Sequence, residues 1–552
     1  MKNQKTCWWV LSHIKKYLPH IILNSLFCIG ASSIYVFLAH YSKKVIDTAS
    51  PDKNSVLIGA LILFGLILLQ IALNATISLV NAFVQGRLTI LLRNRLFTSV
   101  VRKKYPLVFE HHTGDLLNRF TSDIEQVVSG AATILPGLCS MLAKIIAGTI
   151  ALILENYIFA FIVLAVGFIF PLIGRIISKK YKYLHKSVQE TEGEARSFLQ
   201  ESFANIVVIK TFDSEAPILN KLNSYLFKNF KTKMKRSGIQ VTMNTCLNSF
   251  FTIGYYAVLV WGAYGITSGT ISTGTLFYYL QLVSMLRAPL QNVSGILPRY
   301  LAMIASAERL IELENMEVET TALNQGEISD IKNSFEFISA DKLSFAYNDT
   351  LIIKNSSFKI YKNSITAITG GSGGGKSTLF KLLLGLYEPC GGSLTFNGTK
   401  DINAATRPMF SYVPQVNMIL SGTILENLTL CNQNMDMDKI EQACRAAMIY
   451  DFITSLPDGF NTKISERGAG LSEGQIQRIS IARALLFDTP ILLLDESTSA
   501  LDEPTESALL SNIKNMTDKT VIFITHRNTS ISVCDHIINI KNKEFTEQNK
   551  AD

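Results

Sequence analysis

The residues with the most specific chemistry lie in one glycine-rich stretch, Gly370-Gly371-Ser372-Gly373-Gly374-Gly375-Lys376-Ser377. It matches G-x-x-x-x-G-K-[ST] and lies between the β-branched run 364–369 and the helical run 379–384, the context that a phosphate-binding loop requires. Glycines let consecutive backbone N–H groups turn toward an anion, and the N-terminus of the next helix adds the positive end of its dipole. The stretch therefore predicts binding of nucleotide phosphates.

Two side chains at the end of this loop have separate predicted roles. Lys376 supplies a point charge for the β- and γ-phosphates, and Ser377 holds Mg²⁺ through its hydroxyl. The alternative is a flexible glycine-rich turn without a ligand. It is disfavoured by the strand before the loop, the Lys-Ser-Thr sequence at its end and the helix after it.

A second candidate group is a pair of acids after an apolar run. Residues 490–494 are typical of a buried strand, and Asp495 and Glu496 follow at its end. This arrangement would bring Asp495 to Mg²⁺ and Glu496 to the attacking water of a phosphoryl transfer. The alternative is a core strand that merely ends in acids, but two adjacent buried charges are costly unless a cation neutralises them.

The chain that must position these groups has 552 residues, too many for one domain. Only 17% of them are charged, 48% are hydrophobic and the mean hydropathy is +0.24, which is typical of a membrane protein. The net charge of +8 could indicate nucleic-acid binding, but Lys and Arg gather beside apolar runs, so no nucleic-acid partner is expected. The eight cysteines include no C-x-x-C pair, which argues against a zinc site and a disulfide framework.

Six apolar stretches are long enough to cross a membrane as helices, which takes about 20 residues each. They cover residues 18–42, 55–83, 131–154, 156–178, 240–266 and 273–298, within an all-α membrane domain expected over 18–312. Long basic stretches separate spans two and three and spans four and five, so we expect these stretches and both termini in the cytoplasm.

Residues 1–17 combine Trp8 and Trp9 with a basic end, which predicts an interfacial elbow helix rather than a cleavable signal peptide. Because only these residues precede the first span, no peptidase domain is expected before it.

The composition changes after the sixth span. Residues 313–333 are polar and acidic, which predicts a linker. Over 334–552, short β-branched runs alternate with helical patterns, which predicts an α/β domain around the phosphate loop. No internal repeat is visible, so we expect one membrane half and one ATPase domain.

Further motifs accompany the phosphate loop in the order and spacing of one family. They are Phe345-Ala346-Tyr347, Val413-Pro414-Gln415, Leu471-Ser472-Glu473-Gly474-Gln475 with Gln477-Arg478, Ser499-Ala500-Leu501-Asp502 and His526. Residues 105–116 and 205–212 resemble the intracellular loops of ABC exporters, which end in short coupling helices that touch the ATPase. The chain thus resembles a bacterial ABC exporter half-transporter over essentially its whole length. The resemblance implies a six-helix type I exporter fold (type IV ABC fold) followed by a P-loop ABC ATPase domain.

The resemblance also implies roles for single residues. Tyr347 would stack on adenine, and Gln415 would reach Mg²⁺ and sense the membrane domain. Asp495 would support the metal, Glu496 would be the general base and His526 would contact the γ-phosphate. The remaining ATP-binding positions are those of the loop and the residue after it: Gly370, Ser372, Gly373, Gly374, Gly375, Lys376, Ser377 and Thr378.

A last group, Ser472, Gly474 and Gln475, would bind the ATP held by a second subunit, so the resemblance implies a dimer. Neither Glu496 nor His526 is replaced, which favours a homodimer, with a heterodimer as the alternative.

Two positions depart from the family pattern. Glu473 replaces the usual glycine after Ser472, where ATP approaches closely. However, Ser472 and Gln475 form an S-x-x-Q capping box that places Glu473 at the first helical position, where negative charge suits the dipole. We therefore predict a competent motif. Ser465 also replaces a usual glycine, with no clear consequence.

The expected mechanism is alternating access, in which ATP closes the ATPase domains and hydrolysis resets the membrane domain. Arg287 lies inside the sixth span and is costly there unless it faces water, a carboxylate or a substrate, so we expect an amphipathic peptide, lipid or drug-like cargo. The candidate cavity residues are Asn244, Asn248, Gln281, Arg287 and Gln291, although the amides could equally bond neighbouring helices. The alternative functions are import of siderophore-like cargo and a non-transport ATPase.

Overall fold

The computed structural model describes residues 2–48, 53–155, 157–320, 325–371, 373–415, 419–432, 434–465, 468, 470–498 and 500–548. The chain divides into two compact units. One, the membrane unit, comprises Met1–Ser99 and Thr113–Asn315, and the other, the ATPase unit, comprises Val100–His112 and Met316–Asp552.

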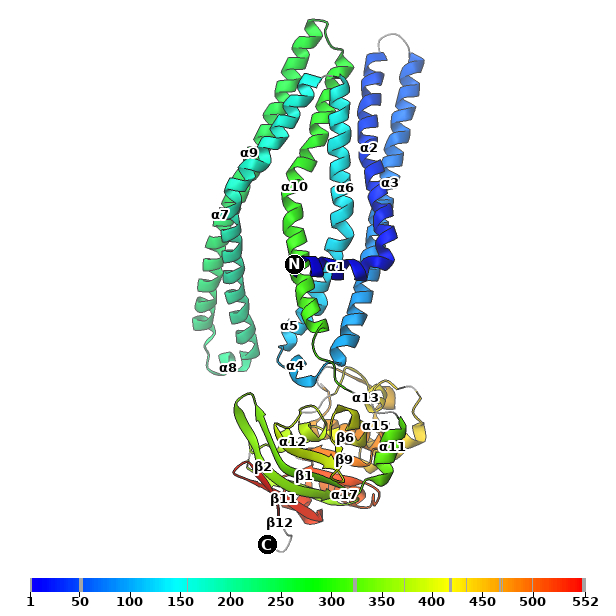
Figure 1. Cartoon of the computed structure of the whole chain (residues 1–552), viewed down its shortest axis with the longest axis vertical. Helices are drawn as coiled ribbons and strands as arrows, with labels where there is room; N and C mark the ends of the chain where they lie inside the picture. Colours follow the sequence, from blue (N-terminus) through cyan, green and yellow to red (C-terminus); the bar gives the residue numbers. More distant parts are fainter. Residues whose placement is uncertain are drawn as a thin grey trace. The chain divides into compact units, whose positions relative to one another are not determined.

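Six long helices form the membrane unit within the described residues (Figure 1). They are α2 (Leu18–Thr48), α3 (Lys53–Val101), α6 (Ile124–Glu155), α7 (Tyr157–Ala204), α9 (Glu215–Thr267) and α10 (Thr273–Glu314). Each expected span lies within one of these helices, apart from residue 156, which falls outside the described residues. Helix α1 (Lys2–Ile14) and a 3₁₀ turn (Lys15–Tyr17) precede α2.

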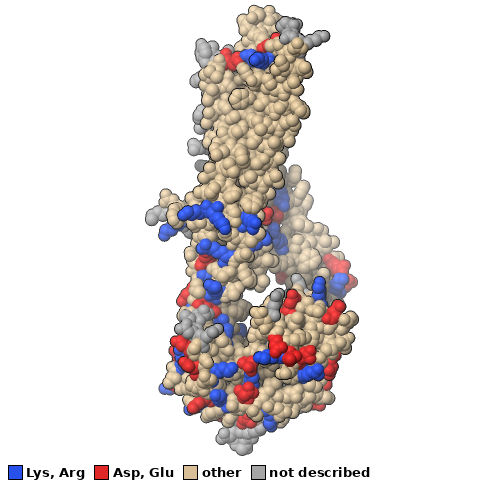
Figure 2. Space-filling model, turned by 90° about the vertical axis from the view of Figure 1, so that its right-hand side faces the viewer, with Lys and Arg blue, Asp and Glu red and all other residues tan. Residues whose placement is uncertain are grey.

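Four described stretches are long and apolar enough to cross a membrane: Gln4–Thr48, Asn54–Val101, Thr113–Glu155 and Glu215–Thr267. Leucines on α3 stay exposed, for example Leu57 and Leu61, as expected for a lipid-facing helix in a structure without lipid. Figure 2 shows one face of these helices almost free of charged side chains along most of its length, with charged side chains at both ends and Lys and Arg more numerous at one of them. This distribution is typical of a membrane-embedded surface.

Short helices connect the long ones where the sequence predicts coupling helices. The first connection holds α4 (Tyr105–Phe109), α5 (Thr113–Asn118) and a π-helical turn (Arg119–Asp123), and the second holds α8 (Ile206–Thr211). Helix α8 and its flank expose the apolar side chains of Val207, Val208 and Phe212.

The membrane helices pack closely where α6 carries glycine. A Cβ added to Gly148 would lie 3.1 Å from Leu286 of α10, and one added to Gly130 would lie 2.8 Å from Met303. Small residues let helix backbones approach in this way when lipid supplies no hydrophobic driving force.

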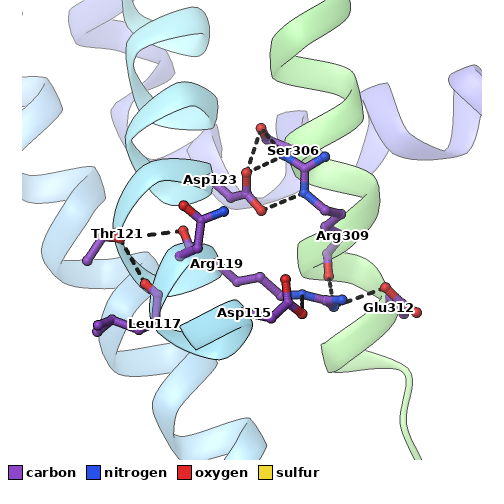
Figure 3. Close-up of polar contacts among 9 residues, drawn as sticks. Asp115, Leu117, Arg119, Thr121, Asp123, Ser306, Arg309 and Glu312 are labelled. Carbon is purple, nitrogen blue, oxygen red and sulfur yellow. Dashed lines mark hydrogen bonds and ion pairs between the residues drawn. The ribbon is translucent and has the colours of Figure 1, made fainter. Parts of the chain in front are cut away.

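Two ion-pair clusters, shown in Figure 3, join the π-helical turn to the end of α10. The carboxylate of Asp123, 1% exposed, accepts hydrogen bonds from Ser306 Oγ at 3.0 Å and Arg309 Nε at 2.7 Å. One turn away, Arg119 donates to Asp115 and Glu312, both at 3.0 Å. A buried charge of this kind is tolerated because it is paired and hydrogen-bonded.

Three sheets form the ATPase unit. The strand orders are β12-β11-β3-β10-β9-β6, β2-β1-β4-β5 and β7-β8. The strands are β1 (Phe337–Tyr347), β2 (Thr350–Tyr361), β3 (Ile365–Gly370), β4 (Gly391–Phe396), β5 (Lys400–Asp401), β6 (Phe410–Val413), β7 (Gly422–Thr423), β8 (Lys463–Ile464), β9 (Ile491–Asp495), β10 (Thr520–Ile524), β11 (His536–Lys541) and β12 (Glu544–Gln548).

Helices flank these strands in the alternating α/β order expected from the sequence. They are α11 (Gln325–Ser334), α12 (Lys376–Leu383), α13 (Ile424–Thr429), α14 (Met437–Ala446), α15 (Tyr450–Ser455), α16 (Glu473–Leu486), α17 (Glu503–Lys514) and α18 (Asn528–Val533). Parallel strands β3, β10 and β9 are adjacent, so their carboxyl ends meet at one edge of the sheet.

Alternate residues of the buried strand β9 face two cores. Ile491 and Leu493 pack into the core beneath β1 and α12, while Leu492 and Leu494 pack into the core that contains α14 and α16. This two-sided burial explains the continuous apolar run in the sequence.

The region predicted as a linker is partly helical. Helix α10 continues to Glu314, and α11 begins at Gln325, both inside the predicted range 313–333. Ile328 and Ile331 pack against the ATPase core, and this pair of apolar residues one turn apart explains why the polar segment folds.

Candidate functional site

The phosphate loop lies between β3 and α12, as predicted. Gly370 has φ +137°, and a Cβ there would lie 2.8 Å from the carbonyl oxygen of Ile540. Gly375 caps α12 in the left-handed region, with φ +102°. Both positions therefore require glycine. Ser372 falls outside the described residues.

Lys376 curls over the loop. Its Nζ donates to the carbonyl oxygens of Gly370 at 2.7 Å and Gly371 at 3.0 Å. The residue is 6% exposed, and burial lowers the pKa of its ammonium group although Glu496 and Asp495 act in the opposite direction. The Lys376 ammonium group thus lies at the N-terminus of α12. The positive end of the helix dipole and this cation would both attract an anion there.

Asp495 ends β9 beside the loop. It accepts hydrogen bonds from Ser377 Oγ at 3.3 Å and from the hydroxyl of Tyr412 at 3.4 Å. Burial raises the pKa of Asp495, and the Glu496 carboxylate adds to the rise while Ser377 opposes it. The predicted pair Ser377 and Asp495 is therefore adjacent, and Tyr412 is a partner that the motifs did not indicate.

Glu496 lies between the other two predicted catalytic residues. Gln415 Nε2 donates to Glu496 Oε2 at 2.7 Å, and His526 Nε2 lies 3.6 Å from Glu496 Oε1. The backbone of Glu496 has φ +47°, an uncommon conformation for a residue with a side chain, and its N–H donates to the carbonyl of Ile524 at 3.0 Å. Backbone strain of this kind is frequent at functional sites.

The capping box predicted at the start of α16 is confirmed. The backbone N–H of Ser472 donates to Gln475 Oε1 at 2.8 Å, and the backbone N–H of Gln475 donates to Ser472 Oγ at 3.3 Å. Glu473 lies in the first turn and is exposed. A Cβ on Gly474 would lie 3.0 Å from the carbonyl oxygen of Ala500, so only glycine fits there without a shift.

None of the contacts among the described residues joins Ser472, Gly474 or Gln475 to the phosphate loop of the same chain. The predicted site residues thus form two groups. One surrounds Lys376 and Glu496, and the other caps α16.

Tyr347, at the end of β1, lies near the loop. Its hydroxyl is 3.5 Å from Thr378 Oγ1, and its ring packs edge-on against the rings of Phe345 and Tyr387. The side chain is only partly buried, which leaves ring surface for a planar ligand.

The predicted cavity residues are brought together only in part. Arg287 Nη2 of α10 donates to Asn248 Oδ1 of α9 at 2.7 Å. Asn244 and Gln281 are exposed, and the side chain of Gln291 falls outside the described residues.

Lys144 is a further candidate that none of the sequence motifs indicates. It lies in α6 within the span 131–154, and its Nζ is 5.1 Å from the centre of the Tyr35 ring of α2. A search of each apolar span for ionisable residues would have found it, because a charge at that depth is rare without a function.

These features together describe an ATP-hydrolysing domain fused to a membrane-spanning domain, and comparisons with known proteins give the same result. Residues 21–290 match the family model described as the ABC transporter transmembrane region, and residues 353–499 match the one described as ABC transporter. The chain therefore belongs to the ABC transporter family. It is a half-transporter of the exporter type, in which ATP hydrolysis is coupled to transport.

Two relatives and one solved structure illustrate the likeness. The ATP-dependent lipid A-core flippase of Syntrophus aciditrophicus (strain SB) is 26% identical over 548 residues, covering 98% of this chain and 90% of the flippase. The lactococcin-G-processing and transport ATP-binding protein of Lactococcus lactis subsp. lactis is 30% identical over 519 residues, which cover 92% of this chain and 72% of that protein. A bacterial Atm1-family ABC exporter with ATP bound has the same fold, with a TM-score of 0.79 and 22% identity over 97% of this chain and 95% of that one.

Proposed function

We propose that this chain exports an amphipathic substrate across the bacterial cytoplasmic membrane, as a dimer that works by alternating access. Both termini and the ATPase unit would face the cytoplasm, since Lys and Arg crowd the ends of the spans that lead to it. The relatives named above are a lipid A-core flippase and a lactococcin-G transporter, which supports an amphipathic cargo such as a peptide, a lipid or a drug-like molecule.

Hydrolysis would use the residues gathered around Glu496. Glu496 would take a proton from the attacking water, because its carboxylate is oriented by Gln415 at 2.7 Å and faces His526. His526 would contact the γ-phosphate, and Lys376 would balance its charge once it leaves the loop carbonyls. Tyr347 would stack on the base.

A metal ion would complete the site. The oxygens available here are the hydroxyl of Ser377, the carboxylate of Asp495 and the amide oxygen of Gln415, the kind of ligand that Mg²⁺ prefers. Ser377 Oγ and Asp495 Oδ1 already lie 3.3 Å apart. Mg²⁺ there would supply positive charge for the phosphate oxygens.

A second copy of the chain would supply Ser472, Gly474 and Gln475. These residues make no described contact with the phosphate loop of their own chain, and the N-terminus of α16 is suited to a phosphate. Because Glu496 and His526 are both present, two identical chains would form two complete sites, which favours a homodimer.

The proposal of an amphipathic cargo with an anionic group rests on the charged residues inside the spans. The six predicted spans contain the cations Lys144, Arg175 and Arg287 but neither Asp nor Glu. Among the described contacts, Arg287 donates to the amide of Asn248, and Lys144 lies over the face of the Tyr35 ring and interacts with the thiol of Cys28. None of these described partners is a carboxylate. Cations inside a membrane require compensation, so an anionic group on the cargo is the partner we propose.

The test measures ATPase stimulation in nanodiscs by dodecyl phosphate, with dodecyl maltoside as the probe of equal tail and neutral head. We expect stimulation by the phosphate only, with Arg287→Ala and Lys144→Met each raising the half-maximal concentration about tenfold. Equal responses of the wild type to both probes, or unchanged responses of both variants, would contradict an anionic cargo. Uptake of the phosphate into inside-out vesicles is expected, whereas uptake only into right-side-out vesicles would indicate import.

A further inference from the structure

Five aromatic side chains form a cluster beside the phosphate loop, and we call Tyr105, Phe109, Phe345, Tyr347 and Tyr387 the aromatic cluster. Tyr387 is at its centre. Its ring centre lies 5.2 Å from that of Tyr347, 5.5 Å from Phe345 and 5.7 Å from Tyr105. All three contacts are edge-to-face, with interplanar angles of 87°, 71° and 76°, which is the preferred geometry for aromatic pairs.

The cluster joins three segments that are distant in the sequence. Tyr347 ends β1, Tyr387 follows α12, and Tyr105 and Phe109 lie in α4, where their rings stack at 5.3 Å. Helix α4 belongs to the ATPase unit although it comes from the connection between two membrane helices. The aromatic cluster is therefore a packed path from the candidate base-binding ring to α4.

Lys381 of α12 reinforces this path. Its Nζ lies 5.8 Å from the ring centre of Tyr347, 6.0 Å from that of Tyr387 and 5.9 Å from that of Phe109. A cation over ring faces at these distances is attracted by their negative quadrupoles. One ammonium group on the phosphate-loop helix thus contacts both ends of the aromatic cluster.

Polar contacts hold α4 in place beside Tyr387. Lys104 Nζ lies 2.9 Å from Glu317 and 3.2 Å from Glu388, the residue after Tyr387. Lys103 Nζ donates to the carbonyl oxygen of Met316 at 2.7 Å. Burial raises the pKa of Tyr387 to about 12, and the phenols of Tyr347 and Tyr105 add to the rise, so the ring stays neutral in cells.

We propose that Tyr387 is a positioning residue that holds Tyr347 for stacking on the base and connects that stack to α4 through Tyr105. The inference rests on the proposed base-stacking role of Tyr347. If base binding favours one arrangement of the Tyr347 ring, the edge contacts transmit that preference to α4, and by thermodynamic linkage the state of α4 changes the affinity for ATP.

The first experiment measures KM for ATP and kcat in the full-length protein. Tyr387→Leu removes the edge contacts and should raise KM about three- to tenfold, with kcat at saturating ATP within about twofold of wild type. Tyr387→Phe keeps the ring and should behave as wild type. The matched control is Tyr361→Leu, a partly exposed tyrosine of the same unit whose ring pairs with His536 rather than with the aromatic cluster.

A second measurement separates the base from the phosphates. Inorganic tripolyphosphate competes for the phosphate loop but has no base, so its inhibition constant should stay within about twofold in Tyr387→Leu while the KM for ATP rises. A parallel rise for both ligands would mean that Tyr387 only supports the loop, and the inference would be wrong. An unchanged KM in Tyr387→Leu would also overturn it.

The connection to α4 has its own test. Tyr105→Leu should raise the KM for ATP about two- to threefold, and the double variant with Tyr387→Leu should show no further increase, because both act through one path. Multiplicative effects in the double variant would overturn the connection. If Tyr347→Leu itself leaves KM unchanged, the base-stacking role in the proposed function fails. If Tyr347→Leu raises the KM for ATP but Tyr387→Leu does not, the base-stacking role of Tyr347 stands and the positioning role of Tyr387 is wrong.

Discussion

The two groups of candidate nucleotide-binding residues differ in how complete they are within one chain. Around the phosphate loop, Lys376 donates to backbone carbonyl oxygens of the loop, and Asp495 and Glu496 accept hydrogen bonds from the side chains of Ser377 and Gln415. At the start of α16, the side chains of Ser472 and Gln475 bond only each other's backbone N–H groups among the described contacts. One chain thus gathers the residues that we propose for hydrolysis, whereas the residues at the start of α16, which we propose for the second subunit, have no described contact with them.

The largest expected effect is on the catalytic side. Glu496→Gln keeps the hydrogen bond from Gln415 possible but cannot accept a proton, so ATP turnover should fall about 10²- to 10⁴-fold while ATP still binds. Size-exclusion chromatography should show a closed dimer that retains ATP. Normal turnover by this variant would remove Glu496 from the mechanism.

Lys376→Ala should cost about 10²- to 10³-fold in turnover, because it removes the charge at the phosphate loop. ATP binding, measured by equilibrium dialysis, should weaken as well, in contrast to Glu496→Gln. Lys362→Ala is the control, since Lys362 is exposed on the same unit and should leave both quantities unchanged.

Ser472→Ala should lower turnover about 10- to 100-fold through the loss of one hydrogen bond to a charged group. Mixed dimers of Ser472→Ala and Lys376→Ala test whether the two groups of residues meet within one chain or between two chains. If the two groups meet between chains, a mixed dimer contains one intact site, and turnover should rise about tenfold above the more active parent, Ser472→Ala. If the mixture is no more active than its parents, each chain closes its own site.

Glu473→Gly should have the smallest effect. The exposed carboxylate lies in the first turn of α16, where the helix dipole favours it, and no contact among the described residues joins it to Lys376 or Glu496, so turnover should stay within about twofold. The melting temperature should fall slightly, since glycine weakens the first turn. A large gain in turnover would mean that Glu473 obstructs ATP.

Much of the fold could be predicted because its patterns are local. Apolar runs located the spans, and the glycine pattern with its flanking strand and helix located the phosphate loop. The capping box at Ser472 followed from helix chemistry alone and was confirmed. These predictions needed no information on distant contacts.

The parts that could not be predicted depend on contacts between distant segments. The polar sequence predicts a linker where α11 forms, because its two isoleucines find an apolar partner only in the folded ATPase core. Tyr412 and Tyr387 carry no motif and become relevant only when folding brings them to Asp495 and Tyr347. Lys144, in contrast, is evident in the sequence as a cation inside an apolar span.

The left-handed backbone of Glu496 has a consequence for evolution and engineering. A conformation that costs about 1–3 kcal/mol for most side chains is present here at the residue that we propose as the general base. Glycine at this position would relieve the strain, so under the proposed role of Glu496 selection for thermal stability alone would favour an inactive transporter. At this position stability and activity therefore favour different residues. Glycine would be the more stable choice, and only selection for transport retains glutamate.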